Sequence, residues 1–243
     1  MISKAKDFIA RQKRNYRVGV ARASANSLLT GLTSQYSAIY AVGLGADSVQ
    51  LGSISSIGSA ISALVSTPVG WLMDRHGIKA LYLLSVLLVA GGSLVRAVAH
   101  DWRLLIPAAI LVSIAGRLSS TGCRVISADS VKNRDRVTAQ NVCGALGSVA
   151  GMISPLIAAF LVTQFGGMTV EGIRPLYYVQ FAGYGLVLLL VASQLREPGR
   201  EQLAGAKNWL GFVADFRDLF RGRRDLVRWI AISALTSLPL AMY

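Results

Sequence analysis

A row of polar side chains interrupts the first long apolar stretch of the sequence, residues 18–43. The side chains recur at steps of four, three, four and three residues: Asn26, Thr30, Thr33, Ser37 and Tyr40. On an α-helix this spacing places them along one face. We interpret that face as the lining of a water-filled cavity, and hydrogen bonding to neighbouring helices within a packed bundle is the alternative.

A single arginine, Arg117, lies inside another apolar stretch, 104–123. It follows Arg103 by 14 residues, which is roughly 20 Å along a helix. An arginine keeps its charge, so it requires water, a partner or a bound anion. The apolar stretches before residue 196 contain no mid-stretch aspartate or glutamate. Three interpretations stay open: a partner outside this sequence, an anionic substrate, or pairing with backbone carbonyls.

A third group with chemical meaning is the decapeptide at 70–79, which reads GWLMDRHGIK between two apolar stretches. Gly77 permits a tight reversal with positive φ, and Gly70 lets a neighbouring helix approach closely. Asp74 is able to cap a helix, while Arg75 and Lys79 favour the polar membrane surface. Without further context, the decapeptide is a short basic turn between two helices.

The composition indicates that lipid surrounds most of the chain. Of its 243 residues, 53% are hydrophobic and 15% are charged, against about 25% charged residues in soluble domains. Lys and Arg outnumber Asp and Glu by 25 to 12, but they fall in blocks between apolar runs and do not form one basic surface. This argues against a nucleic-acid partner. Cys123 and Cys143 form no CxxC pair, and we predict no metal site.

We predict an all-α transmembrane fold, because a bilayer-spanning helix needs about 20 mostly apolar residues. The chain divides into a basic N-terminus, a six-helix bundle, a linker and the start of a seventh helix: 1–17, 18–195, 196–225 and 226–243. Within the bundle the expected spans are 18–43, 48–73, 80–99, 104–123, 137–165 and 175–195.

Basic residues occupy alternate connectors. The N-terminal stretch and the connectors after the second, fourth and sixth spans are rich in Lys and Arg, whereas the other three connectors hold almost none. By the positive-inside rule, the N-terminus and the 196–225 linker are predicted to be cytoplasmic. We therefore expect a multi-pass protein of the cell membrane.

The linker has its own pattern. Its aromatic and aliphatic side chains recur at helical spacing between basic and acidic ones, which predicts an amphipathic helix. Such a helix lies either in the lipid headgroup plane or against the protein's own cytoplasmic face. The seventh apolar stretch begins at Leu226 and the sequence ends at Tyr243, so we expect a truncated seventh helix.

The decapeptide at 70–79 resembles the signature of the major facilitator superfamily, G-x-x-x-D-R-x-G-[RK]-[RK], in the connector between its second and third helices. Gly70, Asp74, Arg75, Gly77 and Lys79 match it. The sequence departs at residue 78, where isoleucine stands in place of a basic residue. The resemblance implies a six-helix N-terminal bundle made of two three-helix inverted repeats. It also implies a cytoplasmic latch that closes in the outward-facing state.

Two later stretches are similar to parts of the same family. The segment around Arg117 resembles the family's fourth helix and following loop, which implies that Asp129 and Arg136 join the latch. In the fifth span, Ser154-Pro155 resembles a motif of drug/proton antiporters that has glycine before the proline, which points weakly to efflux. Thr67-Pro68 in the second span matches Ser154-Pro155 in kind and hints at an internal repeat.

The expected function is secondary active transport of a small solute by alternating access. The cavity would be formed by the polar row and Arg117, and the partners would be the lipid bilayer, a small-molecule substrate and the missing C-terminal half, on the same or a separate chain. No enzyme signature and no cofactor-binding motif is present in the sequence. The alternative is a non-transporting membrane protein, or a truncated or split half-transporter. The substrate and the coupling ion stay open.

Overall fold

The computed structural model describes residues 14–76, 78–131 and 133–194. The chain divides into two compact units, Met1–Gln202 and Leu203–Tyr243, and the described residues all lie in the first. The predicted linker at 196–225, the seventh helix at 226–243, most of the basic N-terminus at 1–17 and Gly77 therefore lie outside the described residues.

Every regular element among the described residues is helical, which confirms the predicted all-α class. The elements are α2 (Arg14–Ser34), α3 (Ser37–Gly43), α4 (Ser48–His76), α5 (Ile78–Ala97), η1 (Trp102–Leu104), α6 (Leu105–Ser130), η2 (Asn133–Asp135), α7 (Arg136–Gln164) and α8 (Val170–Gln194).

Five stretches of these helices are long and apolar enough to cross a membrane: Ser48–Ser66, Lys79–Ala97, Trp102–Ser120, Arg136–Gln164 and Val170–Gln194. They correspond to the second to sixth predicted spans. The chain is therefore a multi-pass membrane protein.

The first predicted span, 18–43, differs from the expectation because it is not one continuous helix. It is divided between α2 and α3, with a turn in which the amide of Tyr36 donates to the carbonyl of Thr33 at 3.2 Å. α2 also carries three arginines and many polar residues, so it is absent from the five apolar stretches. The turn changes the helical phase, and residues on either side of it do not share one face.

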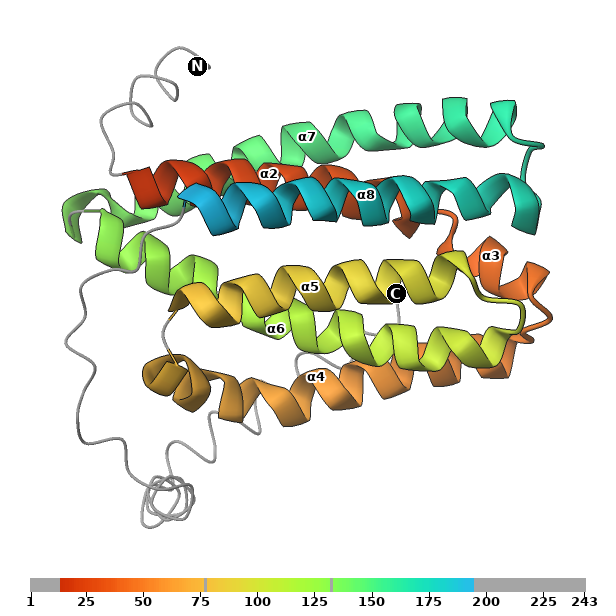
Figure 1. The fold of residues 1–243 in the computed structure, drawn as a ribbon, viewed down its shortest axis with the longest axis horizontal. Coiled ribbons are helices and arrows are strands. Elements are labelled where there is room, and N and C mark those ends of the chain that lie inside the picture. The colour runs from red at the N-terminus through yellow and green to blue at the C-terminus, as the bar shows by residue number, and fades with distance from the viewer. Residues whose placement is uncertain (1–13, 77, 132, 195–243) are drawn as a thin grey trace. The chain divides into compact units, whose positions relative to one another are not determined.

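The long helices pair in a pattern that repeats. α2 packs on α7 and α8, α6 packs on α4 and α5, and α5 packs on α8. Exchanging α2 with α6, α4 with α7 and α5 with α8 turns α2/α7 into α6/α4 and α2/α8 into α6/α5, and it leaves the α5/α8 pairing unchanged. Figure 1 shows that the exchanged helices run in opposite directions, as expected of inverted repeats.

The helices α4 and α7 share further features that fit this exchange. Both are 29 residues long, and each contains one proline, Pro68 in α4 and Pro155 in α7. These prolines are residue 21 of α4 and residue 20 of α7, counted from Ser48 and Arg136. The paired Thr-Pro and Ser-Pro dipeptides of the sequence thus occupy matching positions in matching helices.

The interior of the bundle is formed by α2, α5 and α8, where large side chains such as Leu32, Tyr82, Leu176 and Tyr184 are almost fully buried. The outward faces of the helices are also apolar. Met152 and Leu156 on α7 and Leu186 on α8 are 75%, 72% and 70% exposed. Large apolar side chains that face outward in this number are expected where lipid is the solvent.

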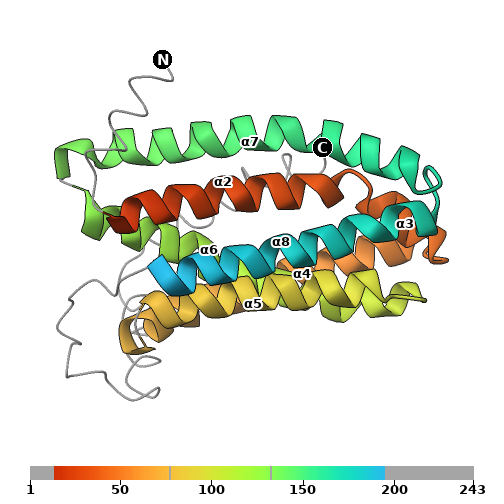
Figure 2. The ribbon, with the colours of Figure 1, turned by 45° about the horizontal axis from the view of Figure 1, so that its top comes forward.

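The helices α2 and α7 lie side by side along much of their length (Figure 2). A Cβ atom added to Gly31 of α2 would overlap the hydroxyl oxygen of Ser154 on α7, so a larger residue at this position overpacks the crossing. The Ser154 hydroxyl donates to the carbonyl of Gly151 at 2.7 Å. Small residues at this crossing therefore set the distance between the two helices.

Each described α-helix except the short α3 runs from one end of the bundle toward the other. The starts of α2, α5 and α7 and the ends of α4, α6 and α8 lie together (Figure 1). We call this the basic end, because its described residues include Arg14, Arg17, Lys79, Arg134 and Arg136. The opposite end holds the connectors with Asp47, Asp101 and Glu171.

Candidate functional site

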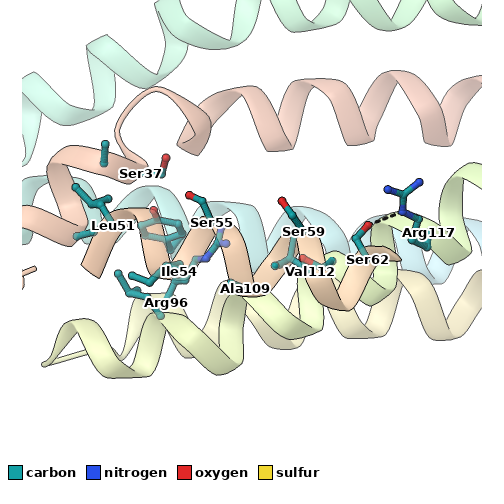
Figure 3. Close-up of a pocket in the computed structure, with 16 residues that line it drawn as sticks. Ser37, Leu51, Ile54, Ser55, Ser59, Ser62, Arg96, Ala109, Val112 and Arg117 are labelled. Carbon is teal, nitrogen blue, oxygen red and sulfur yellow. Dashed lines mark hydrogen bonds between the residues drawn. The ribbon is translucent and has the colours of Figure 1, made fainter. Parts of the chain in front are cut away.

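A cavity of about 450 Å³ lies between α4 and α6 and extends to α3, α5 and α8. Its polar lining consists of five serines, two arginines and a tyrosine: Ser37, Ser55, Ser59, Ser62, Ser113, Arg96, Arg117 and Tyr177. The serines of α4 form a row along it (Figure 3). We call this the α4/α6 cavity.

Arg117 is exposed at one end of the α4/α6 cavity. Its Nε–H donates to the hydroxyl of Ser62, and the rest of the guanidinium points away from that hydroxyl (Figure 3). Ser62 was not among the predicted site residues. The sequence does not single out the serines of the second span, because a run of small polar residues looks the same whether it packs against neighbours or lines a cavity.

The other end of the α4/α6 cavity is formed by Arg96, Tyr177 and Ser37. The Tyr40 hydroxyl donates to the backbone carbonyl of Arg96 at 2.7 Å. The rings of Tyr40 and Tyr177 have centroids 4.9 Å apart. These contacts fix the last turn of α5, and with it Arg96, against α3 and α8.

A second cavity of about 510 Å³ lies between α2 and α7. Its lining is small and polar, and it includes Asn26, Ser27, Thr30, Ser34 and Ser148. We call it the α2/α7 cavity. Because α2/α7 and α6/α4 are exchanged pairs, the two cavities lie on equivalent helix pairs of the repeat.

Two residues of the predicted polar row, Asn26 and Thr30, contact the hydroxyl of Tyr184, which belongs to α8. The Tyr184 hydroxyl on α8 donates to the Asn26 side-chain oxygen at 3.1 Å. The same hydroxyl lies 3.0 Å from the Thr30 hydroxyl oxygen. Tyr184 is 2% exposed, so it orients these groups from within the bundle.

The structure divides the predicted row of five polar residues. Asn26 and Thr30 line the α2/α7 cavity, and Ser37 lines the α4/α6 cavity. Thr33 and Tyr40 are 2% and 0% exposed, so they line neither. The turn between α2 and α3 explains why Ser37 and Tyr40 leave the α2/α7 cavity, because it rotates the residues after it relative to those before. Thr33 precedes the turn, and packing within the bundle buries it instead.

Arg22 lies inside the first predicted span, where the sequence analysis did not single it out, and the structure gives it a buried place. Arg22 is 3% exposed. Its terminal nitrogens donate to the hydroxyls of Ser119 at 2.7 Å and Ser85 at 2.9 Å, and its guanidinium lies 3.8 Å from the centroid of the Tyr82 ring. Its Nε is buried and has no hydrogen-bond partner among the described residues. Arg22 therefore joins α2 to α5 and α6 inside the bundle.

A second polar link inside the bundle also escaped the sequence analysis. Gln180 of α8 is 4% exposed. Its side-chain nitrogen donates to the carbonyl of Leu29 on α2, and its side-chain oxygen accepts from the hydroxyl of Ser93 on α5, both at 3.1 Å. A glutamine in an apolar stretch gives no signal of its own, because its partners come from other helices.

The predicted latch residues share the basic end of the bundle. Gly70, Asp74 and Arg75 lie in the last two turns of α4, and Asp129 is the penultimate residue of α6. Lys79 and Arg136 begin the helices that follow, α5 and α7. A single residue, 77, separates α4 from α5, which agrees with the tight reversal that the glycine predicted. Residue 77 itself lies outside the described residues.

The part of the chain that the structure describes contains no group of three His, Cys, Asp or Glu side chains able to hold a metal ion. The polar groups that it does assemble are hydroxyls, amides and guanidinium groups along two membrane-embedded cavities. Such groups bind a solute reversibly through hydrogen bonds and charge.

The sequence model of the Major Facilitator Superfamily matches residues 20–243, which include every cavity and every predicted latch residue described above. The chain belongs to this superfamily. The match confirms the resemblance that the decapeptide at 70–79 indicated.

Two curated members of the superfamily are similar to this chain. The nitrate/nitrite transporter NrtP of Picosynechococcus sp. is 26% identical over 144 residues, which are 56% of this chain and 27% of the relative. The acurin A biosynthesis cluster MFS-type transporter of Aspergillus aculeatus is 26% identical over 140 residues, 56% of this chain and 24% of the relative. The matched region thus spans about a quarter of each relative.

Solved structures share the fold. A POT family transporter in complex with a thioalcohol-conjugated peptide has a TM-score of 0.59 at 16% sequence identity, with 95% of this chain and 47% of that chain covered. A peptide transporter POT (E310Q mutant) in complex with sulfate also gives 0.59, at 17% identity, with 93% and 45% covered. The chain therefore has the fold of about half of such a transporter.

Proposed function

We propose that this chain is the N-terminal part of a secondary active transporter that moves a small solute by alternating access. The observation that carries the proposal is the pair of polar cavities on repeat-related helix pairs, α4/α6 and α2/α7. Polar groups are costly in a membrane and persist where they contact water, a ligand or each other. Superfamily membership supports the same function.

The solute pathway in this proposal runs between this bundle and a second bundle, on the same or a separate polypeptide. The cavity-lining residues proposed to contact it are Asn26, Thr30, Ser37 and Arg117, from α2, α3 and α6. Thr33 and Tyr40 act behind them, since they are buried. The names of the two curated relatives do not agree on one solute class, so the substrate is argued separately below.

The proposed orientation places the basic end in the cytoplasm of the cell membrane. The described basic residues at that end and the acidic residues at the other, Asp47, Asp101 and Glu171, fit the positive-inside rule. In this orientation the decapeptide at 70–79, which matches the superfamily signature, faces the cytoplasm.

The proposed latch consists of Asp74, Arg75, Asp129 and Arg136, with Gly70, Gly77 and Lys79 shaping the turn. Their positions at the adjoining ends of α4, α5, α6 and α7 support this assignment. Ion pairs at this end would form in one conformation and break in the other. The latch would thereby bias the two-state equilibrium on which alternating access depends.

The test of the function is solute transport by the full-length gene product reconstituted in proteoliposomes. Uptake and efflux are measured for sugars, amino acids, peptides, drugs and inorganic anions, with and without a proton gradient. Saturable transport of at least one solute is expected. Absence of transport for all classes, with a correctly inserted protein, would favour the alternative of a non-transporting membrane protein.

The latch is tested by Asp74→Asn in the same preparation. Loss of an ion pair worth about 1.4 kcal/mol shifts a two-state equilibrium tenfold, so transport is expected to fall by about tenfold while membrane insertion is unchanged. The matched control is Asp47→Asn at the opposite end. Asp47 caps α4 by accepting from the amide of Gln50 at 2.7 Å, and asparagine keeps that acceptor. Unchanged transport in Asp74→Asn would contradict the latch assignment.

A further inference from the structure

We propose that the α4/α6 cavity binds a small anion at two successive guanidinium groups, Arg96 and Arg117, which are connected by the serine hydroxyls of α4. The inference rests on the proposed transport function and adds the substrate class. The anion would contact Arg96 near the end with the acidic connectors and Arg117 nearer the basic end.

The charge of the lining carries the argument. Among the described residues that line the α4/α6 cavity, two are arginines and none is acidic. The α2/α7 cavity, its counterpart in the repeat, is lined by no charged residue at all among those described. The positive charge is therefore a property of one cavity and does not follow from the repeat.

The guanidinium of Arg117 is available to a ligand. Only its Nε has a hydrogen-bond partner among the described residues, the Ser62 hydroxyl. Arg22 shows the contrast, because both of its terminal nitrogens donate to serines and it is 3% exposed. The terminal nitrogens of Arg117 have no hydrogen-bond partner in the part of the chain that the structure describes, and they are able to donate two parallel hydrogen bonds to an oxyanion. The hydrogen bonds of Arg22 thus hold helices together, whereas the terminal nitrogens of Arg117 stay available to a ligand.

The serine row links the two arginines. Ser55, Ser59 and Ser62 follow at steps of four and three on α4 and share one face. Seven residues of helix correspond to about 10 Å. Figure 3 shows the row between Arg96 and Arg117. Hydroxyls donate hydrogen bonds and carry no charge, so the row replaces part of the water around a passing anion without trapping it.

The size of the cavity fits this class of ligand. At about 450 Å³ it is far larger than the volume of one water molecule, about 30 Å³. A polyatomic anion and several waters fit together. The competing explanation for Arg117 is a carboxylate from the second bundle that neutralises it, and the experiment distinguishes the two.

The experiment measures the charge preference of the cavity directly. Ser59→Cys is made in the full-length gene product with Cys123 and Cys143 replaced by serine. The rates of modification by a negatively charged and a positively charged methanethiosulfonate reagent are compared. Ser34→Cys, in the uncharged α2/α7 cavity, is the matched control. Should Ser59→Cys fail to insert, Ser55→Cys takes its place.

Two unit charges interact by about 1 kcal/mol at 4 Å in water and more strongly at lower dielectric, so a nearby guanidinium favours an anionic over a cationic reagent on the order of tenfold. We expect that ratio at Ser59→Cys and a ratio several-fold lower at Ser34→Cys. Adding Arg117→Gln or Arg96→Gln is expected to reduce the ratio at Ser59→Cys several-fold. Nitrate, as the probe anion, is expected to slow modification there and not at Ser34→Cys.

A ratio near one at Ser59→Cys, or no response to Arg117→Gln, would overturn the anion assignment and indicate a neutralising carboxylate. The measurement needs no transport, so it separates the two proposals. An anion-preferring cavity in a protein that moves no solute would refute the transport function alone. Transport of a cationic or neutral solute with a ratio near one would refute only the anion class.

Discussion

Replacement of Arg22 provides a sharp test of the buried network. The side chain lies 3.8 Å from the Tyr82 ring centroid and donates to the hydroxyls of Ser85 and Ser119, yet the structure shows no acidic residue in contact with it among the residues described. Burying a charge without a counter-charge costs several kcal/mol, and the contacts offset part of that cost. We compare methionine, lysine and alanine at this position.

The expected free energies follow from these contacts. Arg22→Met loses a desolvated cation–π contact of about 2 kcal/mol and two hydrogen bonds of about 1.5 kcal/mol each, but it also removes the buried charge. We expect its stability within about 1 kcal/mol of the parent protein. Arg22→Lys keeps the charge without the fork that spans both hydroxyls and is expected to lose about 2 kcal/mol. Arg22→Ala leaves a cavity and is expected to lose about 3 kcal/mol.

The assay is thermal unfolding of the full-length gene product in detergent, followed by tryptophan fluorescence. A change of 1 kcal/mol moves Tm by about 3 °C for a domain of this size. The control is Arg17→Met, which removes an exposed arginine from the same helix and is expected to leave Tm unchanged. If Arg22→Met lost as much as Arg22→Ala while Arg22→Lys kept the parent Tm, the charge itself would be stabilising. The reasoning from an uncompensated buried cation would then be wrong.

Two other predictions concern packing and orientation. Gly31→Ala should lower the free energy of unfolding by about 2 kcal/mol through overpacking, because its Cβ would overlap the Ser154 hydroxyl oxygen. Adding Ser154→Gly to Gly31→Ala should restore most of the loss in Tm. The control Gly144→Ala should have little effect, because nothing lies within 4 Å of the added Cβ. A double variant as unstable as Gly31→Ala would contradict the contact between Gly31 and Ser154. In a cysteine-free background, Asp47→Cys should react with impermeant thiol reagents from outside the cell, and Arg134→Cys should react only after permeabilisation. Labelling of both cysteines from the same side would refute the placement of Asp47 and Arg134 at opposite membrane surfaces.

The helices could be read from the sequence because their signal is local. Lipid requires each crossing to satisfy its own backbone hydrogen bonds, so a continuous apolar run of sufficient length becomes a helix. The second to sixth predicted spans correspond to α4 to α8, with ends that agree within a few residues in most cases. The fourth span is longer than predicted, since α6 continues to Ser130 through residues that are less apolar.

The division of the first span could not be read in the same way. Its apolar content predicts one helix over 18–43, but the chain turns between Ser34 and Ser37. That turn is compatible with the local sequence and is fixed by tertiary contacts, among them the hydrogen bond from the Tyr40 hydroxyl to the Arg96 carbonyl. The predicted row of polar residues was therefore not one face: Asn26 and Thr30 line one cavity and Ser37 the other, while Thr33 and Tyr40 are buried.

The candidate site was predictable in part. Arg117 is conspicuous because a permanent charge in an apolar run is costly wherever the helix packs, and the sequence alone marked it as a candidate site residue. The roles of Ser62 and Arg96 depend on which helices meet, since one lies on α4 and the other on α5. The cytoplasmic latch and the cavity roles stay predictions, and the variants proposed above test them.

The sequence by itself determined that this chain crosses a membrane as helices and that basic residues occupy alternate connectors. It also determined the superfamily to which the chain belongs. These properties depend on residue type and local spacing, which lipid as a solvent converts directly into structure. Only the tertiary structure decided that Arg22 is buried and Arg117 is open to a cavity. Both are arginines in helices. Neighbouring helices bring two hydroxyls to the terminal nitrogens of Arg22 and an aromatic ring to its guanidinium, whereas Arg117 receives one hydroxyl among the described residues, at its Nε.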